Sequence, residues 1–287
     1  MKWISGNNLF FVHVPKCAGM SVRAALTRVG GEDWSPVASD LGLDADEAAR
    51  ITERGRGFDH PVLGLCHPAH LPLALLRDHM PRTWQCLTGA QSFALIRAPR
   101  PRFLSALTQR MKEFQDVGAI RIDDPRVADE AIRVCEWLDG RGPYAEISHI
   151  HFARQTNYVQ LDGQRVVANI FPVERTDALA CWLQDTLGVP VEISHDHSRR
   201  QPLPWARSVQ PLARFIGRRL MPATLRQTLH PLYTNSRLFD AAAKSYGTVH
   251  LGDDVEAFIN RYYAADAALH RSALADAGRI APQKDAP

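Results

Sequence analysis

The feature that most constrains the fold is a short buried strand that leads directly into a tight turn and an amphipathic helix. Residues Asn8–Val14 are rich in Phe and Val, and a run of this length bounded by turn residues predicts a buried strand. From Ala18 onward the apolar positions recur at helical spacing: Val22, Leu26 and Val29. Gly30-Gly31 ends this helix, so Pro15–Gly19 is a strand-to-helix turn.

The same order recurs later in the chain. Ser92–Ile96 predicts a strand, Arg97–Pro101 a turn, and the next helix has one apolar face: Phe103, Leu107, Met111 and Phe114. A third apolar run, Val62–Cys66, predicts a strand and precedes a helical stretch over 72–80. This alternation predicts an α/β fold with a parallel sheet flanked by helices. We therefore expect all three turns to open onto one crevice at the carboxyl ends of the strands.

The C-terminal half predicts further elements of the same kind. We expect a strand over Arg165–Phe171, a helix over Thr176–Leu187 and a largely helical C-terminal part with a long helix over Asp254–Leu274. Residues 1–275 are thus expected to form a single domain with a basic helical insertion at about 200–250. The stretch 276–287 is expected to be a disordered tail.

Composition and charge exclude several classes of protein. With 287 residues, of which 45% are hydrophobic, the chain can bury a large core and is not mainly disordered. The net charge of +3 is too small for a polycation, so we expect no nucleic-acid partner. Five widely spaced cysteines and an apolar run over Leu9–Val14 that is too short for a membrane span or a signal segment predict a cytoplasmic protein with reduced thiols.

Positive charge is concentrated in one stretch. Between Arg199 and Lys244 the chain has nine Lys or Arg residues and one Asp. The same stretch carries an apolar stripe: Leu212, Phe215, Ile216 and Leu220. One interpretation is a solvated helix packed on the main domain, and the other is a surface for an acidic substrate or peripheral contact with an anionic membrane.

The first turn carries the clearest chemical signal. Ala18 and Gly19 are small enough to let backbone N–H groups approach an anion, and the first helical turn leaves its own N–H groups unpaired nearby. Lys16 adds a mobile positive charge and Ser21 a hydroxyl donor. These residues predict a phosphate-binding turn. The turn is not a Walker A loop, because Lys16 precedes its only glycine, and this disfavours ATP with magnesium.

The segment His13–Ser21, with the sequence HVPKCAGMS, resembles the 5′-phosphosulfate-binding loop of sulfotransferases. The similarity is greatest to the branch that contains heparan sulfate 2-O-sulfotransferase and many bacterial carbohydrate sulfotransferases. It implies a P-loop-like fold and metal-independent transfer of a sulfuryl group from 3′-phosphoadenosine 5′-phosphosulfate. The implied product is adenosine 3′,5′-bisphosphate, and the implied acceptor is a hydroxyl of a carbohydrate, lipid-linked or other small molecule. The implied donor contacts of this loop are Lys16, Cys17, Ala18, Gly19, Met20, Ser21 and Val22.

A second segment, Arg97–Ser105, resembles the family's loop for the 3′-phosphate of the donor. Arg97 offers a guanidinium fork to a phosphate, and Ser105 adds a neutral donor. Weaker similarities lie at Phe171–Glu174, His197–Arg199 and Tyr262–Asp266, and they add Ser198 and Arg199 as nucleotide contacts. The sequence departs from the family at Met20, where Thr is common, and at Ala98, where Asp or Asn is usual.

In-line sulfuryl transfer needs a cation near the bridging oxygen of the leaving nucleotide and a base for the acceptor proton. Lys16 fits the role of the cation. Histidine suits the role of the base, because its reference pKa of about 6.5 lets it accept a proton near neutrality. His70, which precedes a helix as the family's base does, is the first choice and His67 the second; a structural role in the turn is the alternative for both. The further ligands that zinc would need beside them are not evident.

Two other functions stay open at this stage. One is a P-loop kinase or nucleotide hydrolase, which would turn over ATP with magnesium. The other is a non-enzymatic module that binds membrane or nucleic acid through the basic insertion, with salt-sensitive affinity. The acceptor pocket is expected within 115–160 and 200–250, where the candidate contacts are Trp137, Tyr144, His149, His151 and Trp205.

Overall fold

The computed structural model describes residues 1–54, 57–115, 124–193, 200–202, 239–241 and 249–280. The chain divides into two compact units, one formed by Met1–Ser194 with His250–Pro287 and the other by His195–Val249. In the second unit, β9 (Arg200–Pro202) and β10 (Phe239–Ala241) pair as antiparallel strands. Most of the basic stretch, together with Ser198, Arg199 and Trp205, lies outside the described residues.

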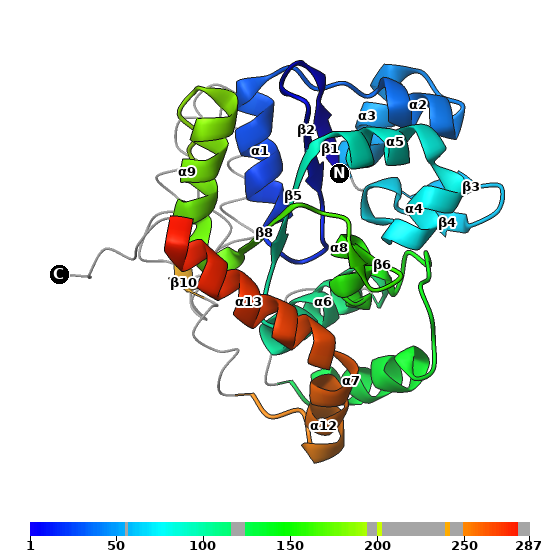
Figure 1. Cartoon of the computed structure of the whole chain (residues 1–287). Coiled ribbons are helices and arrows are strands. Elements are labelled where there is room, and N and C mark those ends of the chain that lie inside the picture. The colour runs from blue at the N-terminus through cyan, green and yellow to red at the C-terminus, as the bar shows by residue number, and fades with distance from the viewer. Residues whose placement is uncertain (55–56, 116–123, 194–199, 203–238, 242–248, 281–287) are drawn as a thin grey trace, which may run out of the picture. The chain divides into compact units, whose positions relative to one another are not determined.

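A four-stranded sheet in the order β1-β2-β5-β8 is the centre of the first unit (Figure 1). The strands are β1 (Lys2–Ile4), β2 (Leu9–Val12), β5 (Gln91–Ile96) and β8 (Asn169–Pro172). β2, β5 and β8 run parallel, with Phe11 opposite Phe93 and Leu95 opposite Phe171. The α/β fold with a sheet flanked by helices is confirmed, but the sheet is not purely parallel, because β1 pairs with β2 in the antiparallel sense.

Helices surround this sheet, and three of them begin and end close to their predicted positions: α1 (Gly19–Val29), α6 (Pro99–Phe114) and α9 (Thr176–Leu187). α9 and α13 (Ala264–Ile280) pack along β8. The other helices are α2 (Ser35–Leu41), α3 (Ala45–Arg54), α4 (Leu73–His79), α5 (Pro81–Gly89), α7 (Pro125–Leu138), α8 (Thr156–Val159) and α12 (Asp253–Tyr262). Short 3-10 helices are η1 (Ser5–Asn7), η2 (Pro68–His70), η3 (Ile150–Phe152) and η4 (Val173–Arg175).

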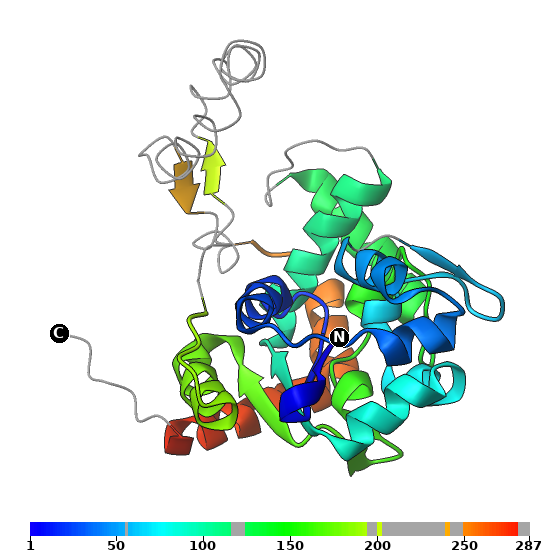
Figure 2. The same cartoon turned by 90° about the horizontal axis from the view of Figure 1, so that it is seen from above.

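These helices form groups around the sheet. α2 packs on α3 and α5, α4 packs on α5, and together they lie on the β1 side of the sheet. α6, α7 and α12 pack on one another below it in Figure 1. Seen from above in Figure 2, the N-terminus lies between α1 and the α2–α5 group. Within the described ranges, we find no helix with the length and apolar character needed to cross a membrane.

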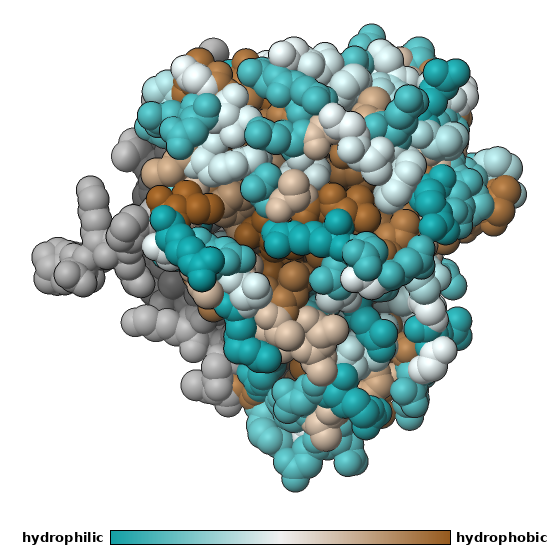
Figure 3. Space-filling view, in the orientation of Figure 1, coloured by the Kyte–Doolittle hydropathy of each residue, from teal (hydrophilic) through white to brown (hydrophobic). Residues whose placement is uncertain are grey.

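Apolar faces explain most of the packing. The predicted inward residues Val22 and Leu26 of α1 are buried, as are three of the four predicted on α6. The fourth, Phe114, is the last residue of α6 and is 44% exposed, so the predicted apolar face is buried only as far as Met111. On the face drawn in Figure 3, hydrophilic side chains cover most of the surface and hydrophobic ones gather near the middle.

The predicted third strand is wrong as a member of the parallel sheet. β4 (Gly64–Cys66) pairs instead with β3 (Phe58–His60) as a separate antiparallel hairpin. Gly64 has a φ of +66°, a left-handed conformation that suits glycine and turns the apolar run back on itself. Val62, at the tip, is 71% exposed. Short apolar runs do not reveal which sheet they join, and here the run joined its sequence neighbour.

Two other elements differ from the prediction. The stretch 165–171 is split, because Gln164–Arg165 forms β7 in a hairpin with β6 (Gln160–Leu161), and β8 begins only at Asn169. The predicted long helix is divided into α12 and α13 at Tyr263, whose buried hydroxyl donates to the carbonyl oxygen of Phe152 at 2.7 Å. α13 continues to Ile280, so 276–280 are helical rather than part of a tail.

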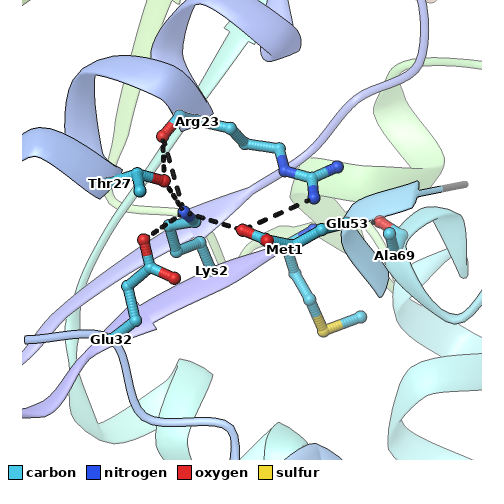
Figure 4. A network of polar contacts seen from close by, with 7 residues as sticks. All are labelled: Met1, Lys2, Arg23, Thr27, Glu32, Glu53 and Ala69. Carbon is cyan, nitrogen blue, oxygen red and sulfur yellow. Dashed lines mark hydrogen bonds and ion pairs between the residues drawn. The ribbon is translucent and has the colours of Figure 1, made fainter. Parts of the chain in front are cut away.

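A buried network of ion pairs attaches β1 to its neighbours (Figure 4). The Nζ of Lys2 is fully buried, forms an ion pair with Glu32, and donates to Glu53 at 3.2 Å. It also donates to Thr27 Oγ1 at 2.6 Å and to the carbonyl oxygen of Arg23 at 3.4 Å, both on α1. Burial acts to raise the pKa of Glu32, but hydrogen bonds from Lys2 and Thr27 outweigh it, and the pKa is lowered. One lysine therefore connects β1, α1 and α3.

Candidate functional site

Two loops lie at the same edge of the sheet. The first loop, residues 13–18, joins β2 to α1, and the second loop, Arg97-Ala98, joins β5 to α6. Because β2 and β5 are parallel neighbours, their carboxyl ends lie side by side, at the lower end of the sheet in Figure 1. The two segments that resemble donor loops are therefore adjacent in space as well as ordered in sequence.

The first loop has an unusual backbone. Lys16 and Ala18 have φ values of +66° and +56°, although neither is glycine. Left-handed residues other than glycine cost conformational energy, and they cluster at ligand sites where the surrounding structure holds them in place. Gly19 and Met20 then open α1, and helix geometry gives their N–H groups no acceptor inside the helix. The N–H of Ser21 already donates to the carbonyl oxygen of Ala18 at 3.1 Å.

Gly19 is held against the ring of His13. A Cβ atom at position 19 would lie 1.9 Å from Nε2 and 2.0 Å from Cδ2 of His13. His13 itself is buried, and its Nδ1 has no hydrogen-bond partner among the described residues. Packing against this ring therefore requires glycine at position 19, in addition to the predicted need for a small residue that lets an anion approach the backbone.

Arg102 is a buried support for the first loop and not a surface arginine. Its side chain is 1% exposed; Nε donates to the carbonyl oxygen of Pro15 at 3.0 Å and Nη2 to that of Ala153 at 2.8 Å.

Burial raises the pKa of the Cys17 thiol to about 11, although Arg102 and Arg97 act in the other direction. Cys17 therefore carries its proton near neutrality and can donate a hydrogen bond.

Gln155, the residue before α8, joins the two loops. Its Oε1 accepts the backbone N–H of Arg97 at 2.8 Å and the thiol of Cys17 at 3.2 Å. Its Nε2 donates to the carbonyl oxygen of Arg97 at 2.8 Å. Gln155 is completely buried, and its own N–H donates to Asp266 of α13 at 2.7 Å. No motif in the sequence marks Gln155, so the sequence analysis missed it.

The other predicted donor residues are placed as follows. Ser21 in the first turn of α1 and Ser105 in the second turn of α6 are both largely buried, whereas Met20 is 57% exposed. Arg100, which also lies in the second segment, is used structurally, because its guanidinium forms a two-point ion pair with Glu256 of α12 at 2.8 Å for each contact.

Four histidines gather beside the first loop. The ring centroid of His70 lies 4.5 Å from that of His13, 5.5 Å from His67 and 5.7 Å from His151. His70 Nδ1 lies 3.3 Å from the carbonyl oxygen of His13. A carbonyl can only accept, so Nδ1 is the protonated nitrogen in this hydrogen bond and Nε2 keeps the lone pair. The two predicted base candidates are therefore close together, and one is attached to the first loop.

Burial keeps this cluster uncharged. It lowers the pKa of His13 and of His70 well below 6.5, and it lowers that of His67. Burial, with Lys16 and His67 nearby, lowers the pKa of His151 to about 3. The sequence analysis predicts His151 only as a contact in the acceptor pocket, and nothing in the neighbouring residues indicates that it lies beside His70.

We expect acid to destabilise the fold through this cluster. An unfolded His151 takes up a proton near pH 6.5, whereas the folded one does so only near pH 3. Because the unfolded state then binds more protons, the free energy of unfolding falls by about 1.4 kcal/mol per pH unit for this group as pH drops below 6.5. Urea denaturation of the wild type and of His151→Phe between pH 7 and 5 checks this. The variant should show the shallower decline, and equal slopes would contradict the expectation.

Three of the five predicted acceptor residues, Trp137, Tyr144 and His149, pack on one another. The ring of Trp137 stacks on that of His149 with centroids 3.8 Å apart, and the guanidinium of Arg141 lies 4.2 Å from the Trp137 centroid. Tyr144 is buried and donates to the carbonyl oxygen of His149 at 3.3 Å. Their contact with an acceptor stays a prediction.

We find no group of three or more His, Cys, Asp or Glu residues arranged to hold a metal ion in the part of the chain that the structure describes.

Comparison with known proteins gives no match: no family model, no curated protein and no solved structure matches this chain. The described residues form an α/β protein with two loops joined at one edge of the sheet and a cluster of buried histidines at the first loop.

Proposed function

We propose that the protein is a sulfotransferase with a P-loop-like site, which moves a sulfuryl group from 3′-phosphoadenosine 5′-phosphosulfate to a hydroxyl of a carbohydrate, lipid-linked or other small-molecule acceptor. The observation that carries this proposal is the adjacency of the two loops, with a histidine cluster against the first. A donor nucleotide has an anionic group at each end, and the two loops offer a cationic side chain each, Lys16 and Arg97.

The 5′ end of the donor fits the first loop on electrostatic grounds. The N-terminus of α1 supplies N–H groups and the positive end of a helix dipole, and Lys16 supplies a full charge. At the 3′ end, Arg97 can make charge-assisted hydrogen bonds to a phosphate. Such paired charges favour a nucleotide with phosphate groups at both ends over an uncharged ligand.

The reaction would proceed in line at sulfur. The acceptor oxygen forms a bond to sulfur, the bond from sulfur to the bridging oxygen breaks, and its electron pair stays on the 5′-phosphate of the leaving nucleotide. Lys16 stabilises the charge that develops on that oxygen. The acceptor proton goes to Nε2 of His70, which is the nitrogen left with a lone pair when Nδ1 donates to His13. Burial lowers the pKa of His70, so the ring is neutral and its Nε2 lone pair is free, and the same burial makes it a weaker base than an exposed histidine.

Calorimetry with adenosine 3′,5′-bisphosphate tests the proposal. We expect the wild type to bind and the variants Lys16→Ala and Arg97→Ala to lose about tenfold or more in affinity, since a hydrogen bond to a charged group is worth about 1.5–3 kcal/mol. Arg50→Ala, at an exposed residue of α3, is the matched control and should bind as the wild type does. Absence of binding by the wild type, or magnesium-dependent turnover of ATP, would contradict the proposal.

A cytoplasmic location and peripheral membrane contact through the 200–250 segment stay predictions beside this proposal. Sedimentation with vesicles of anionic lipid at increasing salt checks the membrane contact, because electrostatic attachment weakens as salt screens it.

A further inference from the structure

We infer that Gln155 is a positioning residue that holds the two loops in one relative orientation and so selects a ligand with an anionic group at each end. The inference rests on the proposed function, because it assigns one phosphate of the same ligand to each loop. Gln155 acts on the backbone of the second loop and on Cys17 of the first.

The first step is the hold on the second loop. The amide of Gln155 both accepts from the N–H and donates to the carbonyl oxygen of Arg97, each at 2.8 Å. Arg97 directly follows β5, which ends at Ile96. The amide of Gln155 thus pairs with the N–H and the carbonyl oxygen of one residue, as the backbone of a neighbouring strand would. The backbone of Arg97 is thereby fixed from one side by a single planar group, and the direction in which its side chain leaves the sheet is restricted.

The second step is the link to the first loop. The same oxygen, Oε1 of Gln155, also accepts the thiol of Cys17. Cys17 lies between the two left-handed residues Lys16 and Ala18, so its side chain is attached to the most constrained part of that loop. A shift of either loop relative to the other would stretch a hydrogen bond to one shared atom.

The third step is the anchor behind Gln155. The carboxylate of Asp266, which is completely buried in α13, accepts the N–H of Gln155 at 2.7 Å and that of Thr156 at 2.9 Å. Gln155 is therefore anchored to α13, a helix that belongs to neither loop. Buried polar groups that are fully paired in this way fix one arrangement, because each unpaired alternative loses hydrogen bonds without access to water.

The consequence concerns ligands that engage both loops. When one phosphate is bound, the second binds with an effective concentration that depends on the geometry between the loops, and this gain is lost if the geometry is wrong. A ligand with one phosphate uses a single loop and gains nothing from their alignment. Loss of Gln155 should therefore reduce selectivity for the doubly charged ligand more than it reduces single-site binding.

The experiment compares three probes: adenosine 3′,5′-bisphosphate, adenosine 3′-monophosphate and adenosine 5′-monophosphate. For Gln155→Leu we expect the affinity for the bisphosphate to fall about tenfold or more while each monophosphate changes by less than about threefold. Gln85→Leu, at an exposed glutamine of α5, is the matched control and should leave all three affinities unchanged. An equal loss for all three probes would overturn the inference in favour of a general structural role.

A second variant covers the case in which Gln155→Leu does not fold. Gln155→Glu keeps the shape and the shared acceptor oxygen but replaces the Nε2 donor with an oxygen that faces the carbonyl of Arg97. We expect the same selective loss for the bisphosphate, and unchanged affinity for it in this folded variant would overturn the inference. Failure of the wild type to bind the bisphosphate would instead remove the proposed function, so the two failures are distinguishable.

Discussion

Gly19→Ala is expected to lower the free energy of unfolding by about 3 kcal/mol and to abolish tight binding of adenosine 3′,5′-bisphosphate. The added methyl would overlap the His13 ring, at 1.9 Å from Nε2, so the ring or the first turn of α1 has to move. A shift of the ring disturbs the backbone of His13, whose carbonyl oxygen contacts His70. A shift of α1 displaces the N–H groups proposed to bind the 5′ end of the donor. Urea denaturation and calorimetry measure the two effects.

The matched control is Gly278→Ala on α13, where an added methyl meets nothing within 4 Å. This change should stabilise the helix by about 0.5–1 kcal/mol. A second check is His13→Ala combined with Gly19→Ala: with the ring removed, the alanine at 19 should cost much less than it does in the wild type. Equal costs in both backgrounds would contradict the steric explanation.

Lys2→Met is expected to destabilise the protein by about 3 kcal/mol. The lysine ammonium is fully buried and satisfies Glu32, Glu53 and Thr27. Its removal leaves the largely buried Glu32 without its cation, whereas Glu53 keeps Arg23 at 3.9 Å. The free energy of unfolding from urea denaturation at pH 7 measures this loss.

Lys112→Met, at an exposed lysine of α6, is the control and should change stability by less than about 0.5 kcal/mol. If the unpaired carboxylate is the cause, Glu32→Gln added to Lys2→Met should recover part of the stability. A loss in the double variant as large as the sum of the two single losses would instead show that the pair is not coupled.

Most of the sheet and its main helices could be predicted because their residues report local periodicity. β2, β5, α1, α6 and α9 each have a clear repeat and a clear end, such as Gly188 at φ +69° after α9. The prediction that Val62–Cys66 joins the parallel sheet failed, because a few apolar residues suit a hairpin strand as well as a strand of the central sheet. The prediction of one long helix failed at Tyr263, where the chain contacts Phe152, far away in sequence, and local periodicity does not report such a contact.

The candidate site shows the same division. Lys16, Gly19 and Arg97 could be selected from sequence because their chemistry follows strand ends directly. Gln155 and His151 could not, because each is an ordinary residue in a segment without periodicity. Their positions depend on the packing of η3 on α6 and of α8 on α4 and α13. His67 and His70 were selected because they follow a strand expected in the parallel sheet. That strand, β4, belongs to a separate hairpin, yet the hairpin and η2 bring both histidines to the first loop.

The sequence by itself determined where strands end and helices begin, and which side chains lie at those junctions. The spacing of apolar and turn residues along a short stretch is enough to predict both. Only the tertiary structure decided that one buried amide joins the two loops, that four histidines share a site and that Lys2 is buried. Those outcomes depend on which distant groups can satisfy each other's hydrogen bonds and charges away from water, and a linear pattern does not contain that information.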